Sequence, residues 1–210
     1  MKTHILSICI TLVSFSAGAS VSLSADSETI NSKAYSIETD YVQSMQWERE
    51  GYGSTLKLRE DRKVGAGVAV GGQLGMAGVN IEFNIEDADG VVAGFGTGPG
   101  YNSFQLAWKH TFTGDYLAPY TTAGYSRWYN SRGRTSDFSE SPILDRVLTD
   151  AEKKDGRFGT DFLFGSLGLQ YNQLSGPLSG VSFYAEVIMM AEAKRSILVP
   201  TGAVGTTYYF

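Results

Sequence analysis

The feature of this sequence that most constrains its fold is a repeated alternation of apolar and polar residues. The alternation is cleanest in Met76–Glu86, where the odd positions from Ala77 to Ile85 are apolar and the even positions hold Gly, Asn and Glu. Successive side chains of a β-strand point to opposite faces. The segment is therefore predicted to be a strand with one apolar face and one polar face.

Similar segments recur along the chain and predict eight strands, each close to the ~10 residues that a tilted strand needs to cross a bilayer. We expect Thr55–Lys63 to extend the second strand, because its apolar positions keep the same phase. Splitting 54–72 in two would give nine strands, so ten is the alternative count. The expected strands are Tyr35–Trp47, Val64–Gly71, Met76–Glu86, Ser103–Phe112, Ala118–Tyr129, Thr160–Asn172, Val181–Ala191 and Thr201–Phe210.

The apolar faces of these strands indicate what surrounds them. In six of the eight we expect no Asp, Glu, Lys or Arg on the outward face, although 19% of the chain is charged. A charge facing lipid at the bilayer midplane costs about 2–4 kcal/mol, whereas a soluble barrel places its polar residues outside. The pattern predicts an all-β fold, a closed antiparallel transmembrane β-barrel.

The first 19 residues have the pattern of a secretory signal peptide. Met1-Lys-Thr-His4 is followed by an apolar run and by Ala17-Gly-Ala19, with cleavage after Ala25 as the alternative. Removal of this segment would also remove Cys9, the only cysteine. We expect residues 20–33 to be a flexible periplasmic lead-in and 34–210 to be one barrel domain. The acidic balance of the chain argues against a nucleic-acid partner.

The connections alternate in length, as they do in transmembrane barrels. We expect short periplasmic turns at 71–75, 113–117 and 173–180, and external loops at 48–53, 87–101, 130–159 and 192–200. Both ends of the barrel chain then lie on the periplasmic side. Within the longest loop, Ser141-Pro142 could begin a short helix that runs to Lys154 and places Ile143, Leu144, Val147 and Leu148 on one side.

The last strand alternates up to a terminal aromatic residue, with Tyr208 and Phe210 on the same face. It resembles the terminal strand of bacterial outer-membrane β-barrels. With the export signal and the Ala118–Tyr125 segment, the chain resembles the small outer-membrane barrels, namely the outer-membrane protein A barrel domain and the outer-membrane protein X and W families. The resemblance implies that Tyr208 and Phe210 are the signal read by the barrel-assembly machinery, with periplasmic chaperones as further partners. It also implies a monomer in the outer membrane.

Several charged residues fall on the polar faces and would point into the barrel. Our hypothesis is a network in which Lys109 and Arg127 bridge Glu82, Glu86 and Glu186, with Glu38 and Asp40 on the same side. Buried charges need partners. The network would fill and stabilise the lumen; the alternative is a charged constriction in a narrow pore. It predicts that replacing Arg127 by Leu lowers the thermal unfolding temperature.

Residues for chemistry are few. After processing, His110 is the only histidine, and its phase places it outward beside Trp108 and Phe112, as an interfacial residue. Lipid A deacylase barrels place a His and a nearby Ser on their outer surface, but no His-x-Ser pair occurs here. Glu86–Gly90 is interpreted as a solvated acidic turn and Gly94–Gly100 as a mobile external loop. We expect no catalytic residues, no metal site and no cofactor.

Two arginines of the longest loop, Arg132 and Arg134, follow a predicted strand at the level of lipopolysaccharide phosphates. Guanidinium groups suit phosphate geometry, so a lipopolysaccharide contact is a hypothesis beside that of an ordinary solvated loop. The expected function is a non-enzymatic envelope protein of the outer membrane, with a structural or surface-interaction role. The alternatives are a narrow channel for small or apolar solutes and, with less support, a lipid-modifying enzyme.

Overall fold

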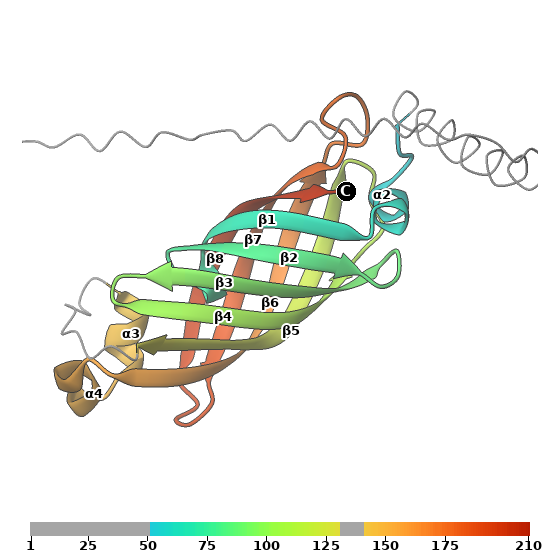
Figure 1. Cartoon of the computed structure of the whole chain (residues 1–210). Helices are drawn as coiled ribbons and strands as arrows, with labels where there is room; N and C mark the ends of the chain where they lie inside the picture. The colour runs from blue at the N-terminus through green and yellow to red at the C-terminus, as the bar shows by residue number, and fades with distance from the viewer. Residues whose placement is uncertain (1–50, 131–140) are drawn as a thin grey trace, which may run out of the picture. The chain divides into compact units, whose positions relative to one another are not determined.

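The computed structural model describes residues 51–130 and 141–210, and they form a closed antiparallel barrel (Figure 1). Neighbouring strands pair in sequence order, and β1 pairs with β8 to close the ring. The predicted fold class and the count of eight strands are both confirmed. The strands are β1 Val64–Gly71, β2 Ala77–Asn84, β3 Asp89–Gly98, β4 Tyr101–Thr111, β5 Leu117–Asn130, β6 Phe158–Asn172, β7 Val181–Glu192 and β8 Leu198–Tyr209.

One of the eight strands is not where the sequence pattern placed it. The strand expected at 35–47 lies outside the described residues, and the ring closes without it. Strand β3 was expected to be part of a glycine-rich loop, so that prediction was wrong. Its odd positions, such as Val91 and Phe95, face outward, and glycines take most of its inward positions. Space explains the glycines: a Cβ on Gly96 would lie 2.0 Å from the carbonyl oxygen of Leu74.

This change reassigns several connections to the other end of the barrel. We call the end where β8 finishes the C-terminal end, and the opposite end the loop end. The antiparallel order places the β2–β3, β4–β5 and β6–β7 turns at the C-terminal end. The turns at 113–117 and 173–180 therefore lie at the same end of the barrel, as expected. Segment 71–75, however, lies at the loop end, with the β5–β6 and β7–β8 connections, and residues 51–53 lie at the C-terminal end.

The segment before β1 is a helix rather than the expected extension of a strand. Helix α2 spans Thr55–Asp61, and the Ser54 side chain caps it by accepting a hydrogen bond from the Lys57 amide at 3.2 Å. Thr55, Leu58 and Arg59 are its buried residues. Leu56 and Leu58 matched the alternation of a strand, but they lie in a helix. Ser54 is a favoured N-cap residue, and it begins that helix.

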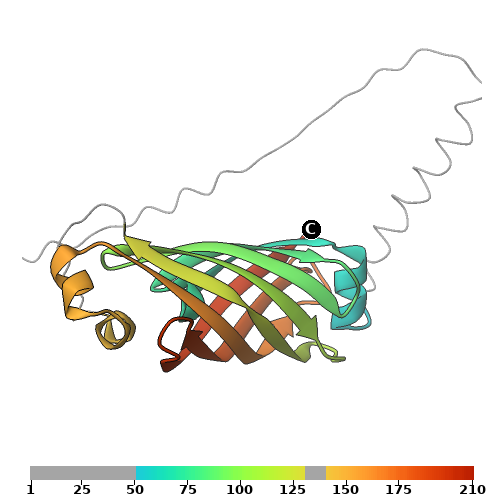
Figure 2. The same ribbon diagram turned by 90° about the horizontal axis from the view of Figure 1, so that it is seen from below.

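The predicted helix in the longest connection exists, but it is divided in two. Helix α3 spans Pro142–Val147 and α4 spans Asp150–Asp155, where Thr149 and Glu152 form a reciprocal capping box. Leu144, Val147 and Leu148 are buried, as the predicted apolar side required. Figures 1 and 2 show α3 and α4 at one end of the barrel and α2 at the other.

The outer face of the strands is apolar. Phe95, Leu167 and Val187 are 67%, 71% and 73% exposed, respectively. Among the described strands, three charged residues take outward positions: Asp89, Arg127 and Asp161, all within four residues of a strand end. Asp161 corrects the expectation that the outward face of the sixth strand carries no charge.

Among the residues that the structure describes, no helix is both long enough and apolar enough to cross a membrane.

Candidate functional site in the barrel lumen

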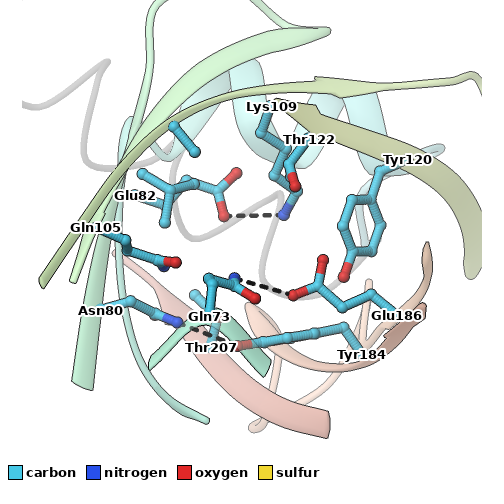
Figure 3. A pocket seen from close by; sticks show the side chains of 12 residues that line it. Gln73, Asn80, Glu82, Gln105, Lys109, Tyr120, Thr122, Tyr184, Glu186 and Thr207 are labelled. Carbon is cyan, nitrogen blue, oxygen red and sulfur yellow. Dashed lines mark hydrogen bonds and ion pairs between the residues drawn. The ribbon is translucent and has the colours of Figure 1, made fainter. Parts of the chain in front are cut away.

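The interior of the barrel is filled with polar side chains around a small cavity. The cavity measures about 30 Å³, which is room for about two water molecules. Figure 3 shows the side chains that surround it. The lining residues belong to η1 (Gly72–Leu74) and to six strands. Its polar and charged lining residues are Gln73, Asn80, Glu82, Gln105, Lys109, Tyr120, Thr122, Tyr184, Glu186 and Thr207.

Glu82 is the centre of the half of the lumen nearer the C-terminal end. Its side chain is 4% exposed and forms ion pairs with Arg59 of α2 and with Lys109 of β4, the latter at 2.9 Å. The hydroxyl group of Tyr209 donates to the same carboxylate at 2.9 Å. A buried carboxylate is tolerated when cations and hydrogen-bond donors surround it in this way. The barrel wall and the helix that covers its end are thus joined through one side chain.

Lys109 extends this network across the lumen. Its ammonium group donates to Gln170 Oε1 at 2.7 Å and lies 4.7 Å from the centre of the Tyr120 ring. Gln170 in turn donates to the Tyr209 hydroxyl at 3.0 Å. The Tyr120 ring has room because it packs over Gly168, where a Cβ would lie 2.3 Å from the ring. The ammonium therefore exchanges its water for two oxygen acceptors and an aromatic face.

Glu186, near the middle of β7, is the wall glutamate that η1 reaches from the loop end. Gln73 of η1 donates to it through Nε2 at 3.2 Å, and Ser166 of β6 donates at 2.7 Å. Gln73 is a neutral partner, in contrast to the two cations around Glu82. Each end of the barrel thus sends one polar side chain inward to one glutamate of the wall.

Helix α2 closes the C-terminal end through contacts with every turn there. Arg59 Nε donates to the Asp87 carbonyl at 2.9 Å, and the Thr55 hydroxyl donates to the Asp115 carbonyl at 2.5 Å. Just after the helix, Arg62 donates to the carbonyls of Ser179 and Tyr209 at 2.9 and 2.8 Å. A small apolar cluster lies beneath, formed by Tyr52, Leu58, Leu174 and Tyr209.

The loop end is closed by an apolar cluster instead. Trp128 of β5 is 1% exposed, stacks on Tyr101 at 4.6 Å between ring centres, and donates through Nε1 to the Gln73 carbonyl at 2.8 Å. Helix α3 inserts Leu144 and Val147 beside it. The cluster consists of Tyr101, Ala107, Trp128, Leu144, Val147, Leu148, Phe158, Phe162, Phe164, Ile188, Met190, Val199 and Ala203.

The structure brings together three of the five residues of the hypothesised network. Glu82, Lys109 and Glu186 face the lumen, with Lys109 paired to Glu82. Glu86 follows the end of β2 and is exposed. Arg127 lies on the outer face, where it pairs with Asp161 at 3.4 Å, because the inward position beside it belongs to Trp128. The bridging roles given to Glu86 and Arg127 are therefore corrected. Glu38, Asp40, Arg132 and Arg134 lie outside the described residues.

Sequence reasoning missed Arg59, the second cation at Glu82. It was assigned to a strand extension, and no contact in the lumen was predicted for it. Two signals could have found it: the Ser54 cap, and the four-residue spacing of Thr55 and Arg59, which places both on one face of a helix. Gln73 was missed because 71–75 was interpreted as a simple turn.

The remaining residues of interest lie on the outer surface. His110 Nδ1 lies 2.9 Å from Asp89 Oδ1, which also accepts a hydrogen bond from Trp108 Nε1. The cross-strand neighbour of His110 is Thr121, whose hydroxyl donates to the Ser166 carbonyl. The terminal aromatics Tyr208 and Phe210 both point outward and stack on each other, with 6.4 Å between ring centres.

Within residues 51–130 and 141–210, no three His, Cys, Asp or Glu side chains are grouped so that they could hold a metal ion. No protein-family model matches the chain, and no curated protein matches it.

The solved structures that resemble this fold include two outer-membrane proteins. One is the N-terminal β-barrel domain of Pseudomonas aeruginosa OprF, with 14% identity and a TM-score of 0.47, covering 75% of this chain and 99% of that one. The other is the Yersinia pestis outer membrane protein Ail, with 12% identity and a TM-score of 0.38, covering 71% of this chain and 99% of that one. At this similarity the assignment of the fold rests on the strand pairing itself, which gives an eight-stranded antiparallel barrel with an apolar exterior and a polar lumen.

Proposed function

We propose that this protein is a non-enzymatic integral barrel of the bacterial outer membrane, with a closed lumen and a structural or surface-interaction role. The observation that carries the proposal is the filling of the barrel. Ionic contacts of α2 close one end, an apolar cluster closes the other, and about 30 Å³ remains between them. An eight-stranded barrel has an interior just wide enough for side chains to fill.

The exterior supports a membrane location. The large apolar residues on the outward positions of the strands would be a severe aggregation hazard in water, whereas hydrocarbon accommodates them. Outward aromatic residues lie near the strand ends, including Trp108, Tyr171 and Tyr208, as in the interfacial belts of membrane proteins. The predicted export signal agrees with this location.

A non-enzymatic role is supported by the chemistry of the outer surface. The pair formed by His110 and Asp89 would need a nucleophile or a bound water to act on a lipid. Thr121, the hydroxyl residue opposite His110 on β5, already donates a hydrogen bond to the Ser166 carbonyl. The two glutamates that line the lumen cavity, Glu82 and Glu186, both accept hydrogen bonds, and the cavity leaves little room for a substrate.

The distinguishing experiment is single-channel recording of the processed chain in a planar bilayer over a range of salt concentrations. The proposal predicts a silent bilayer that nevertheless contains folded protein, verified by heat-modifiable gel migration. Steady, discrete openings would show a hydrated pore and favour the alternative of a narrow channel for small solutes.

We further propose that Tyr208 and Phe210 serve as the terminal assembly signal. The outward direction of both rings leaves them accessible along the edge strand before the barrel closes. Replacement of Phe210 by Ser should reduce the yield of assembled barrel in cells while leaving refolding of the purified chain in detergent unchanged. Equal yields in cells would contradict this role.

A further inference from the structure

A second candidate site lies on the outer surface of the barrel, near the loop end of β4, β5 and β6. Two cationic side chains, Arg127 of β5 and Arg157 just before β6, line a hollow of about 700 Å³. The aromatic side chains of Phe104, Tyr129 and Phe158 form much of its remaining wall. The phosphate contact predicted from the sequence was assigned to Arg132 and Arg134, and not to these two arginines.

The charge in this hollow is not balanced within the described residues. The Arg127 side chain is 46% exposed, and its Nη1 lies 3.4 Å from Asp161 Oδ1. The same Asp161 oxygen accepts a hydrogen bond from the Tyr125 hydroxyl at 2.5 Å. Arg157 is exposed, and no carboxylate of the described residues lies within 4 Å of it. Among the described residues, Asp161 is thus the one carboxylate within 4 Å of either guanidinium group.

The Arg127 side chain extends toward the end of the barrel. A Cβ on Gly159 would lie 3.0 Å from Arg127 Nη2, and Gly159 stands opposite Tyr129, two residues nearer the loop end than Arg127. The guanidinium therefore lies along β6 over a residue without a side chain. A long cationic side chain on a lipid-facing strand extends in this way to reach the polar interface.

The surface beneath the cations is apolar. Leu106 of β4 and Leu163 of β6 flank Tyr125 in the ladder, on the midplane side of Arg127, and they are 55% and 60% exposed. A free anion would use only the cations, whereas a lipid would use both parts of this surface. Guanidinium groups match the geometry of phosphate oxygens.

We propose that this hollow binds the phosphate group of an anionic membrane lipid, with Arg127 and Arg157 at the phosphate and the acyl chains along Leu106 and Leu163. The proposal rests on the membrane location argued above. Asp161 has a defined part in it: it holds Arg127 in place and at the same time competes with the phosphate for that cation.

The test is native mass spectrometry of the processed chain released from neutral detergent micelles, with lipid added at increasing concentration. The probe is dioleoyl phosphatidic acid, and dioleoyl phosphatidylcholine is the matched lipid without net charge. The variants are Arg127→Gln, Arg157→Gln and their double substitution. Arg146→Gln is the matched control, because Arg146 is an exposed arginine of α3 at the same end of the barrel.

The processed chain should bind phosphatidic acid in preference to phosphatidylcholine. Each substitution at the hollow should weaken that binding about fivefold, as expected for one cation near an anionic membrane surface, and the double variant should lose the preference. Asp161→Asn should strengthen binding. Equal binding by the double variant, or an equal loss in Arg146→Gln, would overturn the proposal. Heat-modifiable gel migration reports barrel folding separately, so a failure of lipid binding is distinguishable from a failure of the barrel.

Discussion

The two ends of this barrel are closed by different physical means, although each sends one side chain inward to a glutamate of the wall. At the C-terminal end, Arg59 and Lys109 surround Glu82 with charge. From the loop end, Gln73 reaches Glu186, whose other donor is also neutral, the Ser166 hydroxyl, and the closure itself is a large apolar cluster. A buried charge pair is strongly destabilising when one partner is lost, whereas an apolar cluster loses stability in proportion to the volume removed. The two ends should therefore fail differently.

The largest effect is expected at the charged end. Replacement of Glu82 by Leu leaves Arg59 and Lys109 buried without their shared carboxylate, which should lower the free energy of unfolding by about 3–5 kcal/mol. Urea-dependent unfolding in lipid vesicles, followed by gel migration, measures this change. The matched control is Glu60→Leu, which removes an exposed carboxylate of α2.

A second variant separates charge from packing at the same place. In the double variant Glu82→Leu with Lys109→Met, one uncompensated cation is also removed, so part of the lost stability should return. If Glu82→Leu alone left the free energy of unfolding within about 1 kcal/mol of the parent protein, the network around Glu82 could not hold α2 on the barrel wall.

A smaller and more local effect is expected at the apolar end. Replacement of the fully buried Leu144 by Ala should cost about 2–3 kcal/mol, toward the low end for such truncations, because α3 can separate from the barrel without unfolding it. Proteolysis of the segment that contains α3 and α4 should become faster. Arg146→Ala, on the exposed side of α3, serves as the control. An unchanged rate of cleavage would mean that Leu144 does not hold the loop in place.

The smallest effect is expected for Arg127→Leu. Its partner Asp161 lies on the outer face, and exposed ion pairs contribute about 0–1 kcal/mol. The network hypothesised from sequence predicted a clear fall in the unfolding temperature for this variant, whereas the structure predicts almost none. Thermal unfolding of Arg127→Leu beside Glu82→Leu therefore tests directly which arginine belongs to the lumen. A fall as large as that of Glu82→Leu would return Arg127 to the network.

The sequence was sufficient to predict the barrel, because period-two alternation records which face meets lipid. Strand Ala77–Asn84 was predicted almost to its ends in this way. The alternation failed where the lumen needed space. In β3 the inward positions are mostly glycine, and this composition predicted a flexible loop rather than a strand. The glycines are needed because Leu74 and Tyr101 occupy the space beside them.

The candidate site was predictable only where both partners lie on strands. Glu82 and Lys109 were expected to pair, because each falls on the polar face of a clear strand. Arg59 and Gln73 reach the lumen from α2 and η1. The Ser54 cap indicates the helix, but where such an end segment packs depends on tertiary contacts. For Arg127, the small residues of β5 left its two faces poorly distinguished. The interior position belongs to Trp128, which donates a hydrogen bond to the Gln73 carbonyl and packs in the apolar cluster.

In this structure, side chains fill the lumen and close it at both ends. The most direct measurement is the reactivity of a single cysteine placed at Gln105, which lines the internal cavity and is 4% exposed. Residues 20–210 contain no cysteine, so Gln105→Cys gives one reporter, and Asp155→Cys on the exposed helix α4 gives its control. With a membrane-impermeant thiol reagent, the cysteine at 105 should react about a hundredfold more slowly than the control, because the lumen must first open. Equal rates at the two positions would show an open, hydrated lumen and would rule out a barrel closed by its own side chains.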